Sequence, residues 1–520
     1  MDVKIIIKKD AYHDSVALMS LSGKLTAIAG VSDAVVSMAT DMNKDLLRRI
    51  GIYTTAVDAA GANDLMIAVR AENETICAEA VQLAEESLAK KSGARKGSGE
   101  VQPASVMSAV KLMPEANLAI ISVPGQYAAR EAMQALKNGL HVMMFSDNVS
   151  VEEEIALKKY AHQQELLMMG PDCGTAIINN VGLCFANVVR QGNIGIVGAS
   201  GTGTQEVSVL IDRMGGGVSQ VIGTGGRDLS EAVGGITMLD GLAALARHEA
   251  TEVIVLISKP PAESVANKIL DKVKGIAKPV VICFINGDAA QVEKAGAYFG
   301  KNLEATAQMA VALSKGEKPA SCCSEDGGLG ELAASKTAKL APTQQYIRGL
   351  FCGGTLCDEA MHIAKASGLK TYSNIAKKAE DKLEDPHTSK AHTFIDLGDD
   401  VFTQGKPHPM IEPSLRLPRL LKEAADPETA VILMDFELGY GSHPDPVGIT
   451  LPAIMEAKRA AQDAGRHLEI IGYVCGTEQD IQGRIRQEQK LAAAGVTLAK
   501  SNTQAARLAG LIAARREEKK

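Results

Sequence analysis

Short apolar runs alternate with longer segments of helical periodicity along most of the chain. Residues 118–123 and 141–145 are runs of strand length, and each is followed by a segment in which apolar positions recur three or four residues apart. Such runs, bounded by Gly, Pro, Asn or Asp, are typical of strands buried on both faces, with helices between them. The pattern predicts an α/β fold with several doubly wound parallel-sheet domains, both Rossmann-like and flavodoxin-like.

Changes in this pattern divide the chain into four predicted domains and a linker. Residues 1–95 are expected to form a small N-terminal α/β domain, because they begin with a strand pattern and end in a helical one that runs into the polar, glycine-rich residues 93–99. Residues 319–345 are rich in Ser, Gly and Ala and have weak periodicity, which predicts a linker. The other predicted domains, each with alternating strands and helices, are 100–190, 191–318 and 346–515.

Three glycine-rich turns each follow a predicted strand and lead into a predicted helix. Such a turn aims backbone N–H groups outward at the positive end of the helix dipole, and glycine has no Cβ to block an approaching anion. Phosphate or carboxylate is the expected ligand, although glycines can also serve the geometry of tight turns alone. The candidate anion-binding residues are Ser200, Gly201, Thr202, Gly203, Gly225, Gly226, Gly353, Gly354 and Thr355.

Four side chains in the loops after predicted strands are candidate catalytic residues. Arg227 and Glu231 follow the second glycine turn, where a positioned cation would stabilise a developing oxyanion. Lys259 stands at a strand end before two prolines, as either a substrate-binding cation or a solvated loop charge. His443, like His408, lies in a loop of Gly and Pro that could direct its imidazole into a site, and a hydrogen-bonded structural role is the alternative.

Other polar residues also have both a chemical and a structural explanation. Cys173 could act as a nucleophile, but no His stands near it in sequence and buried free cysteines are common. Asp396, Asp399 and Asp400 could hold Mg²⁺ or cap the segment that follows them. The nine cysteines include no CxxC pair and have no His at metal-ligand spacing, so no zinc or redox site is predicted, and no residue is assigned as a metal ligand.

The composition is that of an ordinary globular protein. The 520 residues are 46% hydrophobic and 22% charged, with a formal net charge of −7. Basic residues form no block apart from the C-terminal tail, which also carries acid, and aromatic residues make up 3%, so nucleic acid is not an expected partner. No apolar run reaches the roughly 18 residues that span a bilayer, and the N-terminus has a strand pattern, so the protein is expected to be cytoplasmic.

Five motifs stand in a fixed order along the chain: Gly170-Pro171-Asp172-Cys173, Gly198-Ala199-Ser200-Gly201-Thr202, Gly225-Gly226-Arg227-Asp228, residues 435–446, and Gly476-Thr477-Glu478. In this order they resemble the succinyl-CoA synthetase superfamily and, most closely and over nearly the whole chain, the FdrA family of acyl-CoA-synthetase-like proteins. The resemblance implies that the second motif cradles a phosphoryl group. It also implies a CoA-binding-like Rossmann domain at 100–190, a flavodoxin-type ligase domain at 191–318 and a ligase-CoA-like domain at 346–515.

Three departures from the synthetases bear on the activity that the resemblance implies. The synthetases relay a phosphoryl group through a histidine, whereas no His occurs here between His248 and His362. No segment between 318 and 346 has the length of an ATP-grasp module. Residues 93–99 are followed directly by the helical pattern 105–113, in place of the glycine-rich turn that opens the CoA domain. With these departures, the sequence still predicts a phosphate-binding site but contains no internal group to carry a phosphoryl group.

The leading hypothesis is a subunit of a carbamoyltransferase that uses phosphate. The resemblance to the FdrA family implies action on oxalurate, giving oxamate and carbamoyl phosphate, and this chemistry needs neither CoA nor a phosphohistidine. One alternative is an acyl-CoA synthetase subunit, similar to succinate-CoA ligase, that needs a separate nucleotide-binding partner. Another is a non-catalytic scaffold that binds an acyl phosphate or a nucleotide. Phosphate or carbamoyl phosphate is the expected ligand, CoA or nucleotide are further possibilities, and partner subunits and self-association are expected.

Overall fold

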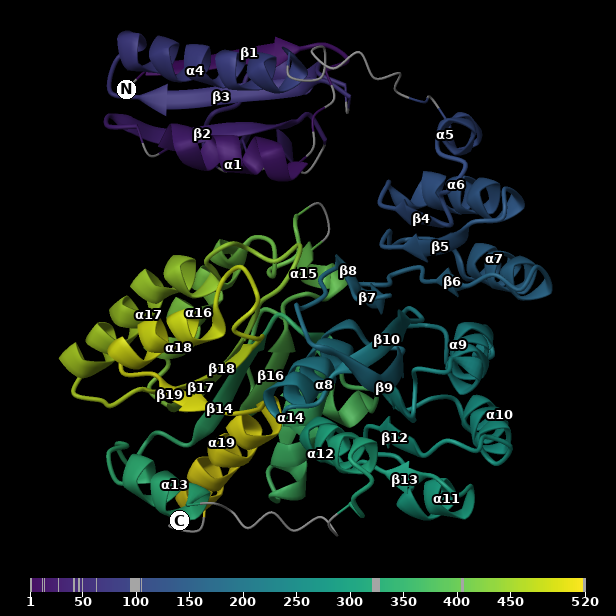
Figure 1. The fold of residues 1–520 in the computed structure, drawn as a ribbon. Helices are drawn as coiled ribbons and strands as arrows, with labels where there is room; N and C mark the ends of the chain where they lie inside the picture. Colours follow the sequence, from purple (N-terminus) through teal and green to yellow (C-terminus); the bar gives the residue numbers. More distant parts are fainter. Residues whose placement is uncertain are drawn as a thin grey trace. The chain divides into compact units, whose positions relative to one another are not determined.

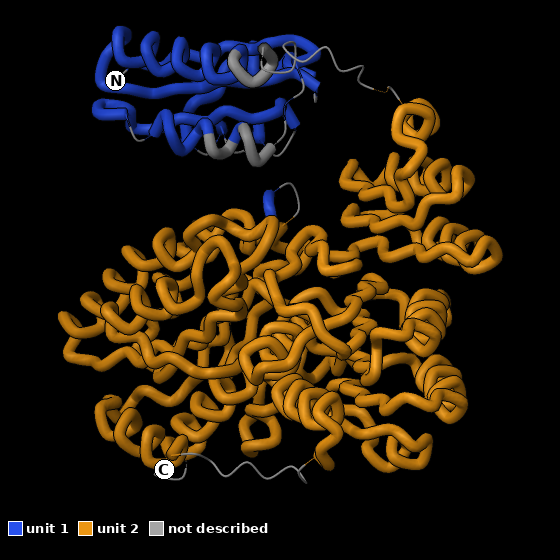
Figure 2. Tube along the Cα trace, viewed as in Figure 1, with its two compact units in different colours: residues 1–102, 404–407 blue, residues 103–403, 408–520 orange. Residues whose placement is uncertain are grey.

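The computed structural model describes residues 2–517 apart from 12, 14, 27, 41–42, 45–46, 49, 62, 94–102, 104, 320–327 and 404–405. These residues form two compact units (Figure 2), one of residues 1–102 with 404–407 and the other of residues 103–403 with 408–520. Most of the predicted linker at 93–99 lies outside the described residues. None of the helices in the described part of the chain is both long and apolar enough to cross a membrane.

The N-terminal unit is a three-stranded antiparallel sheet with helices against it. The strand order is β1-β3-β2. Leu18 and Leu25 of one helix pack with Ala80 and Ala84 of another against the sheet, which gives the unit a core of its own. Its elements are β1 (Asp2–Lys8), α1 (Ser15–Thr26), β2 (Val31–Met38), α3 (Thr55–Asp58), β3 (Leu65–Ala71) and α4 (Glu74–Gly93).

The larger unit begins with a small parallel sheet in the order β4-β5-β6. Ala128 and Leu157, on two of its helices, are buried against the strand residue Val142. Ser150 caps the third helix, where it accepts a hydrogen bond from the Glu153 N–H at 3.2 Å. The elements are α5 (Val106–Leu112), β4 (Leu118–Ile121), α6 (Gly125–Lys137), β5 (His141–Met144), α7 (Val151–Gln163) and β6 (Met168–Met169).

A seven-stranded sheet follows, in the order β13-β12-β11-β9-β10-β7-β8. Its first five strands are parallel, and an antiparallel hairpin, β7 (Thr175–Ile178) and β8 (Val181–Cys184), completes one edge. The hairpin thus extends this sheet and not the preceding one. The other elements are β9 (Gln191–Gly198), α8 (Gly201–Arg213), β10 (Val218–Gly223), α9 (Ile236–Arg247), β11 (Val253–Ser258), α10 (Glu263–Val273), β12 (Val280–Phe284), α11 (Ala289–Lys294), β13 (Tyr298–Phe299) and α12 (Leu303–Ser314).

The last sheet is six-stranded and parallel throughout, in the order β15-β16-β14-β17-β18-β19. Its elements are β14 (Tyr346–Phe351), α14 (Gly354–Ala366), β15 (Thr371–Ser373), η2 (Ala379–Asp381), β16 (His392–Asp396), α15 (Asp400–Thr403), η3 (Pro413–Arg416), α16 (Leu417–Ala425), β17 (Thr429–Glu437), α17 (Pro446–Asp463), β18 (Glu469–Cys475), α18 (Arg484–Ala493), β19 (Thr497–Ala499) and α19 (Asn502–Glu517).

The two large sheets share one hydrophobic core. Helices α8 and α14 lie side by side between the sheets (Figure 1). Val207 of α8 and Leu356 of α14 belong to the same buried cluster as Ile196 of β9, Ile347 of β14 and Ala509 of α19. Because β9 and β14 each lead directly into one of these helices, the shared core brings the two glycine turns together.

The predicted α/β fold with several parallel sheets is confirmed, and most predicted strands coincide with observed ones. Gly201 and Gly354 are each the first residue of a helix after a strand, whereas Gly226 lies in a turn after β10 that precedes α9 by several residues. The predicted linker at 319–345 needs correction, since part of it forms α13 (Leu329–Thr337). Ala333 of that helix is fully buried, so packing on the shared core outweighs the weak local periodicity.

Candidate functional site

The N-termini of α8 and α14 meet at a hydroxyl pair. Ser200 is the N-cap of α8, and its Oγ accepts a hydrogen bond from the Gly203 N–H at 3.0 Å. The same hydroxyl donates to Thr355 Oγ1, in the first turn of α14, at 2.6 Å. Both helices therefore point their positive ends at one place, which we call the α8–α14 junction.

Two of the predicted glycines are required by this close approach of the helices. A Cβ atom at Gly353 would lie 2.8 Å from Thr202 Oγ1, and one at Gly203 would lie 2.9 Å from Thr355 Cγ2. At Gly201, by contrast, the nearest atom to an added Cβ is 3.7 Å away. An added Cβ there would make only ordinary van der Waals contact, so packing does not demand a glycine at 201.

Several backbone N–H groups at the junction have no acceptor. Among the described residues, no acceptor is within hydrogen-bonding distance of the N–H groups of Gly201, Thr202, Gly354 or Thr355. The N–H groups just before α14, those of Cys352 and Gly353, are bound by the Asp435 carboxylate. The free donors of the two first turns form an arrangement that suits an anion.

A lysine and a carboxyl group stand beside the first turn of α14. A Cβ atom at Gly354 would lie 3.3 Å from Lys259 Nζ and 2.4 Å from Asp396 Oδ2. Lys259 follows β11 and Asp396 ends β16, so the two sheets each contribute one of these groups. Asn374 fixes Asp396 by accepting a hydrogen bond from its backbone N–H at 3.0 Å.

Asp396 can exchange a proton near neutral pH. Burial raises the pKa of this carboxyl to about 7, while the Lys259 ammonium and the Gly398 N–H lower it. A carboxyl group with such a pKa beside an anion site is suited to general acid or base catalysis. The sequence alone predicts only a cation-binding or capping role for Asp396. Only the tertiary structure shows that Asp396 shares a site with Lys259.

Each helix also carries a buried glutamate one turn beyond the junction. Glu206 of α8 accepts a hydrogen bond from the Asn502 N–H at 3.1 Å, and Glu359 of α14 accepts one from Asn502 Nδ2 at 2.7 Å. Burial raises the pKa of both carboxyls, that of Glu359 to about 7. Asn502, at the start of α19, thus links the two helices through hydrogen bonds to both glutamates.

Arg227 is held by the small parallel sheet. Its Nη2 donates to the Val149 carbonyl at 2.8 Å and lies 3.0 Å from Glu154 Oε2, while 43% of the side chain stays exposed. Buried Lys158 lies 2.9 Å from Glu154 and 2.8 Å from Asp228, which holds the loop that carries Arg227 against α7. Arg227 is therefore positioned, and part of its guanidinium is already paired.

The neighbouring glycines have separate reasons for their places. Gly225 has φ of +84°, and a Cβ atom there would lie 2.1 Å from the Pro171 carbonyl, so a tight turn explains it. Gly226 leaves room for the carboxylate of Asp172, whose Oδ2 would be 3.4 Å from an added Cβ. Burial raises the pKa of this Asp172 carboxyl to about 6, while Arg227 and Lys259 lower it, so the second glycine turn lies within electrostatic reach of Lys259.

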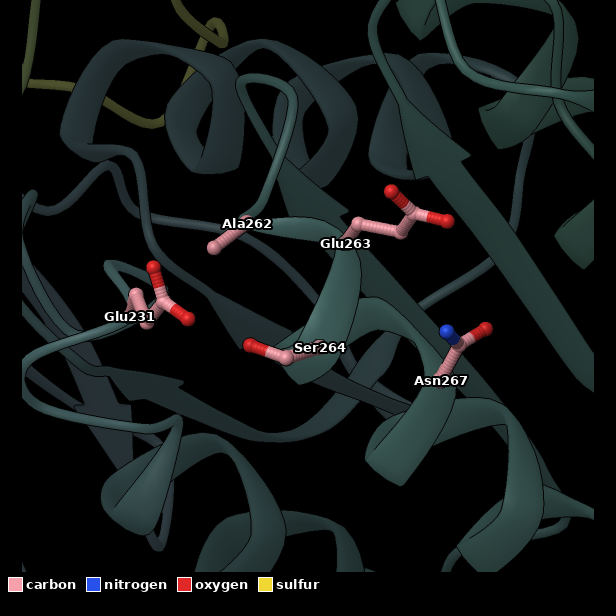
Figure 3. A pocket seen from close by; sticks show the side chains of 5 residues that line it. All are labelled: Glu231, Ala262, Glu263, Ser264 and Asn267. Atoms are coloured by element: carbon pink, nitrogen blue, oxygen red, sulfur yellow. The ribbon is translucent and has the colours of Figure 1, made fainter.

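Glu231 lines a cavity at the start of α10. The cavity has a volume of about 410 Å³, and its other lining residues are Ala262, Glu263, Ser264 and Asn267. Figure 3 shows Glu231 across from the first turn of α10, with Glu263 on the helix. Two carboxylates in the wall make this cavity unsuited to an anion, and none of its lining residues belongs to the junction.

Four other candidate residues have a structural explanation, two through hydrogen bonds and two through burial. His443 Nδ1 accepts a hydrogen bond from the Asp445 N–H at 3.0 Å, in the loop before α17. Asp399 Oδ1 accepts one from the Val401 N–H at 3.1 Å, which is the capping role considered for it. Burial raises the pKa of the Cys173 thiol to about 12 and lowers that of His408 to about 4. Neither a thiolate at 173 nor an imidazolium at 408 is therefore available at neutral pH.

Comparison with known families gives three matches along the chain. The family described as "AllF, heavy metal-associated domain" matches residues 1–105, "CoA binding domain" matches 189–286, and "CoA-ligase" matches 350–512. The CoA-binding match falls on the sheet around β9 and includes the first turn of α8, whereas the sequence resemblance placed that domain at 100–190. The CoA-ligase match includes the first turn of α14.

The N-terminal match implies a soft metal ion, which the residues of that unit do not fit. Its one cysteine, Cys77, is 1% exposed, and the thiol donates to the Asp2 carbonyl at 3.2 Å. Soft ions are usually held by paired cysteines. The whole sequence has no CxxC pair. The unit therefore matches that family without a thiolate pair.

Several known proteins are similar to this chain. The chain is 52% identical over 514 residues to "Uncharacterized protein YahF" of Escherichia coli, covering 98% of both chains. It is 28% identical over 237 residues to succinate–CoA ligase [ADP-forming] subunit alpha 1 of Archaeoglobus fulgidus, covering 43% of this chain and 79% of that one. A solved ATP citrate lyase from Methanothrix soehngenii matches at 15% identity with a TM-score of 0.35, covering 80% and 85% of the two chains.

The class of protein follows from the fold and the domain matches together: an acyl-CoA-synthetase-like α/β protein with CoA-binding and CoA-ligase domains. Its identity to YahF over almost the full length of both chains shows that the chain belongs to the FdrA family. The resemblance seen in the sequence motifs is thereby confirmed.

Proposed function

We propose that the chain is a subunit of an acyl-CoA-synthetase-like enzyme, and that the α8–α14 junction binds the phosphoryl group of an acyl phosphate. The observation that carries the proposal is the convergence of two helix N-termini, with unpaired N–H groups at Gly201, Thr202, Gly354 and Thr355, beside the ammonium of Lys259. Helix N-termini and a fixed cation favour phosphate over neutral ligands.

The junction also supplies the groups that acyl transfer from phosphate requires. When a nucleophile attacks the acyl carbon, the carbon–oxygen bond to phosphate breaks and negative charge grows on the leaving phosphate. The N–H groups and Lys259 are positioned to stabilise that charge. Asp396, whose pKa is about 7, can take the proton of the nucleophile. Arg227, Glu231 and His443 stay predicted catalytic residues.

Activation of the acyl group is assigned to another chain. Between His248 and His362 the sequence offers no histidine to carry a phosphoryl group, and residues 318–346 are too few for an ATP-grasp domain. The relatives named as succinate–CoA ligase are named as alpha subunits, which supports a partner for this chain as well. CoA and a nucleotide are then ligands of the assembled enzyme.

A carbamoyltransferase is the second candidate, and the missing histidine favours it. Phosphate bound at the junction would attack the carbamoyl carbon of oxalurate, the carbon–nitrogen bond would break, and the nitrogen of the departing oxamate would take a proton. The products are carbamoyl phosphate and oxamate. This reaction needs phosphate at the junction but no phosphoryl carrier. A scaffold that only binds an acyl phosphate would use the same junction without turnover.

The decisive experiment compares two reactions on the protein purified with its co-purifying subunits. One assay supplies acetyl or succinyl phosphate with CoA and measures thioester, and the other supplies oxalurate with phosphate and measures carbamoyl phosphate. We expect turnover in one assay, and Lys259→Ala to lower it at least about 10²-fold, the usual effect of removing one oxyanion-stabilising group. Activity unchanged in Lys259→Ala would contradict the site. Phosphate binding without turnover in either assay would support the scaffold.

A further inference from the structure

A buried group of three potential metal ligands lies directly behind the glycine turn of α14. The Sγ atom of Cys352 and carboxylate oxygens of Asp435 and Glu437 all lie within 4.8 Å of one another. Cys352 follows β14, and the two carboxylates lie on the neighbouring strand β17, on the same face because they are two residues apart. The exposed fractions of the three residues are 4%, 0% and 2%.

The Glu437 carboxyl meets no N–H or O–H donor in full hydrogen-bond geometry, although the Asp435 carboxyl and the Cys352 thiol are close enough to interact with it. Neither of its oxygens has a hydrogen bond, although the residue is 2% exposed. A buried carboxylate without a donor is costly, because it loses hydration without replacement. Both oxygens of Glu437 are thus available to a ligand between the three residues.

The other two residues each offer one potential ligand atom. The Asp435 carboxylate accepts four hydrogen bonds from three donors, because the Cys352 N–H is shared between its two oxygens, Gly353 N–H binds Oδ2 and Arg416 Nη1 binds Oδ1. A metal ion could replace one of the two contacts of the shared Cys352 N–H. The Cys352 thiol is reduced and makes no disulfide. A bidentate Glu437, one Asp435 oxygen and the Cys352 sulfur give four donor atoms, the number usual for zinc.

The charges of the three potential ligands and of Arg416 also suit a divalent cation. With an ion bound and all three groups deprotonated, Cys352, Asp435 and Glu437 would carry three negative charges, and Arg416, which is 1% exposed and 2.9 Å from Asp435, carries one positive charge. A divalent ion would make the buried group neutral. Mixed sulfur and oxygen donors select a first-row ion such as Zn²⁺ or Co²⁺ over Mg²⁺ or Ca²⁺.

We propose that Cys352, Asp435 and Glu437 form a binding site for a first-row divalent metal ion of the zinc type. The ion binds as the Cys352 thiol loses its proton to solvent. Asp435 also holds the N–H groups of Cys352 and Gly353, so the ion would fix the turn that presents α14 to the junction. The proposal stands whether or not the junction binds an acyl phosphate.

Titration of the untagged, reduced full chain with Co²⁺ tests the site. We expect one equivalent to bind and to give the near-ultraviolet charge-transfer absorption of a cobalt thiolate. Cys352→Ser should abolish this absorption, and Glu437→Gln, which keeps the side-chain shape, should weaken binding about 10- to 100-fold. Cys357→Ser is the matched control, because Cys357 is a buried thiol on α14 outside the group. It should bind like the wild type.

Metal analysis of the protein isolated from cells grown with Zn²⁺ provides a readout that does not depend on variants. Less than about a tenth of an equivalent of metal, together with no cobalt–thiolate absorption on titration, would overturn the proposal. An absorption that persists in Cys352→Ser, or that disappears in Cys357→Ser, would also overturn it. Loss of phosphate binding with metal binding intact would count only against the junction.

Discussion

At the scale of single residues, a substitution at Gly201 tests whether this glycine serves ligand binding or only the packing of the turn. A Cβ atom at 201 would make only ordinary van der Waals contacts, with Thr175 Oγ1 at 3.7 Å and Gly174 Cα at 4.0 Å, so Gly201→Val should fold, but the side chain would occupy the room beside the free N–H groups. We expect phosphate affinity, measured by calorimetry, to fall at least about tenfold, or about 1.4 kcal/mol. Gly330→Val is the matched control, because Gly330 also lies in the first turn of a helix and an added Cβ there meets no atom within 4 Å. Equal affinities in both variants would remove Gly201 from the site.

Asp396 gives the junction a pH dependence whose sign can be stated. Its folded pKa is raised to about 7, so the carboxyl is neutral below that pH and negative above it. An ionised Asp396 beside the anion site repels the ligand, and sulfate affinity should therefore fall between pH 6 and pH 8. Sulfate is the suitable probe because its own charge is constant over this range. Asp396→Asn should bind sulfate equally at both pH values, and an unchanged fall in that variant would assign the titration to another group.

At the scale of elements, the hydrogen bond between Ser200 and Thr355 joins the two helices at the point where the ligand is expected. Ser200→Ala removes both a helix cap and this bond and should cost about 1 to 2 kcal/mol of unfolding free energy. Thr355→Val removes only the bond. The two changes together should cost less than their sum by at least about 0.5 kcal/mol in a double-mutant cycle measured by urea unfolding.

A second cycle is the control for this coupling. Ser150 caps α7, and its side chain bonds to Glu153 and not to Thr355. The unfolding free-energy costs of Ser150→Ala and Thr355→Val should therefore be additive. Additivity in the Ser200 cycle as well would mean that the hydroxyl pair does not couple the helices.

At the scale of the whole molecule, the missing phosphoryl carrier predicts that the purified chain alone makes no acyl-CoA from ATP, CoA and a carboxylic acid. A free carboxylate is a poor acyl donor, and proximity to a thiol does not supply the free energy of activation. The assay is run on the isolated chain and again on the complex with its co-purifying subunits. Turnover by the isolated chain within the usual range of about 1 to 10³ per second would show that the chain activates its own substrate.

The sequence by itself determined the elements and where the glycine turns fall between them. Strands such as β11 and β17 are continuous apolar runs, and Ser200, Gly201 and Gly354 stand at strand-to-helix turns because capping and glycine preferences act over a few residues. The order of the motifs was also sufficient to indicate the FdrA family. The weakly periodic α13 was missed, since its stability comes from burial against the shared core.

Only the tertiary structure decided which of these turns act together. The sequence contains no sign that α8 and α14 face each other, because residues 155 positions apart meet only when two sheets bury their inner faces in one core. The same packing placed Lys259 and Asp396 at one helix start, gave Glu231 a separate cavity, and assembled Cys352 with Asp435 and Glu437. Local preferences fix elements, whereas the burial of apolar faces between distant segments fixes which side chains share a site.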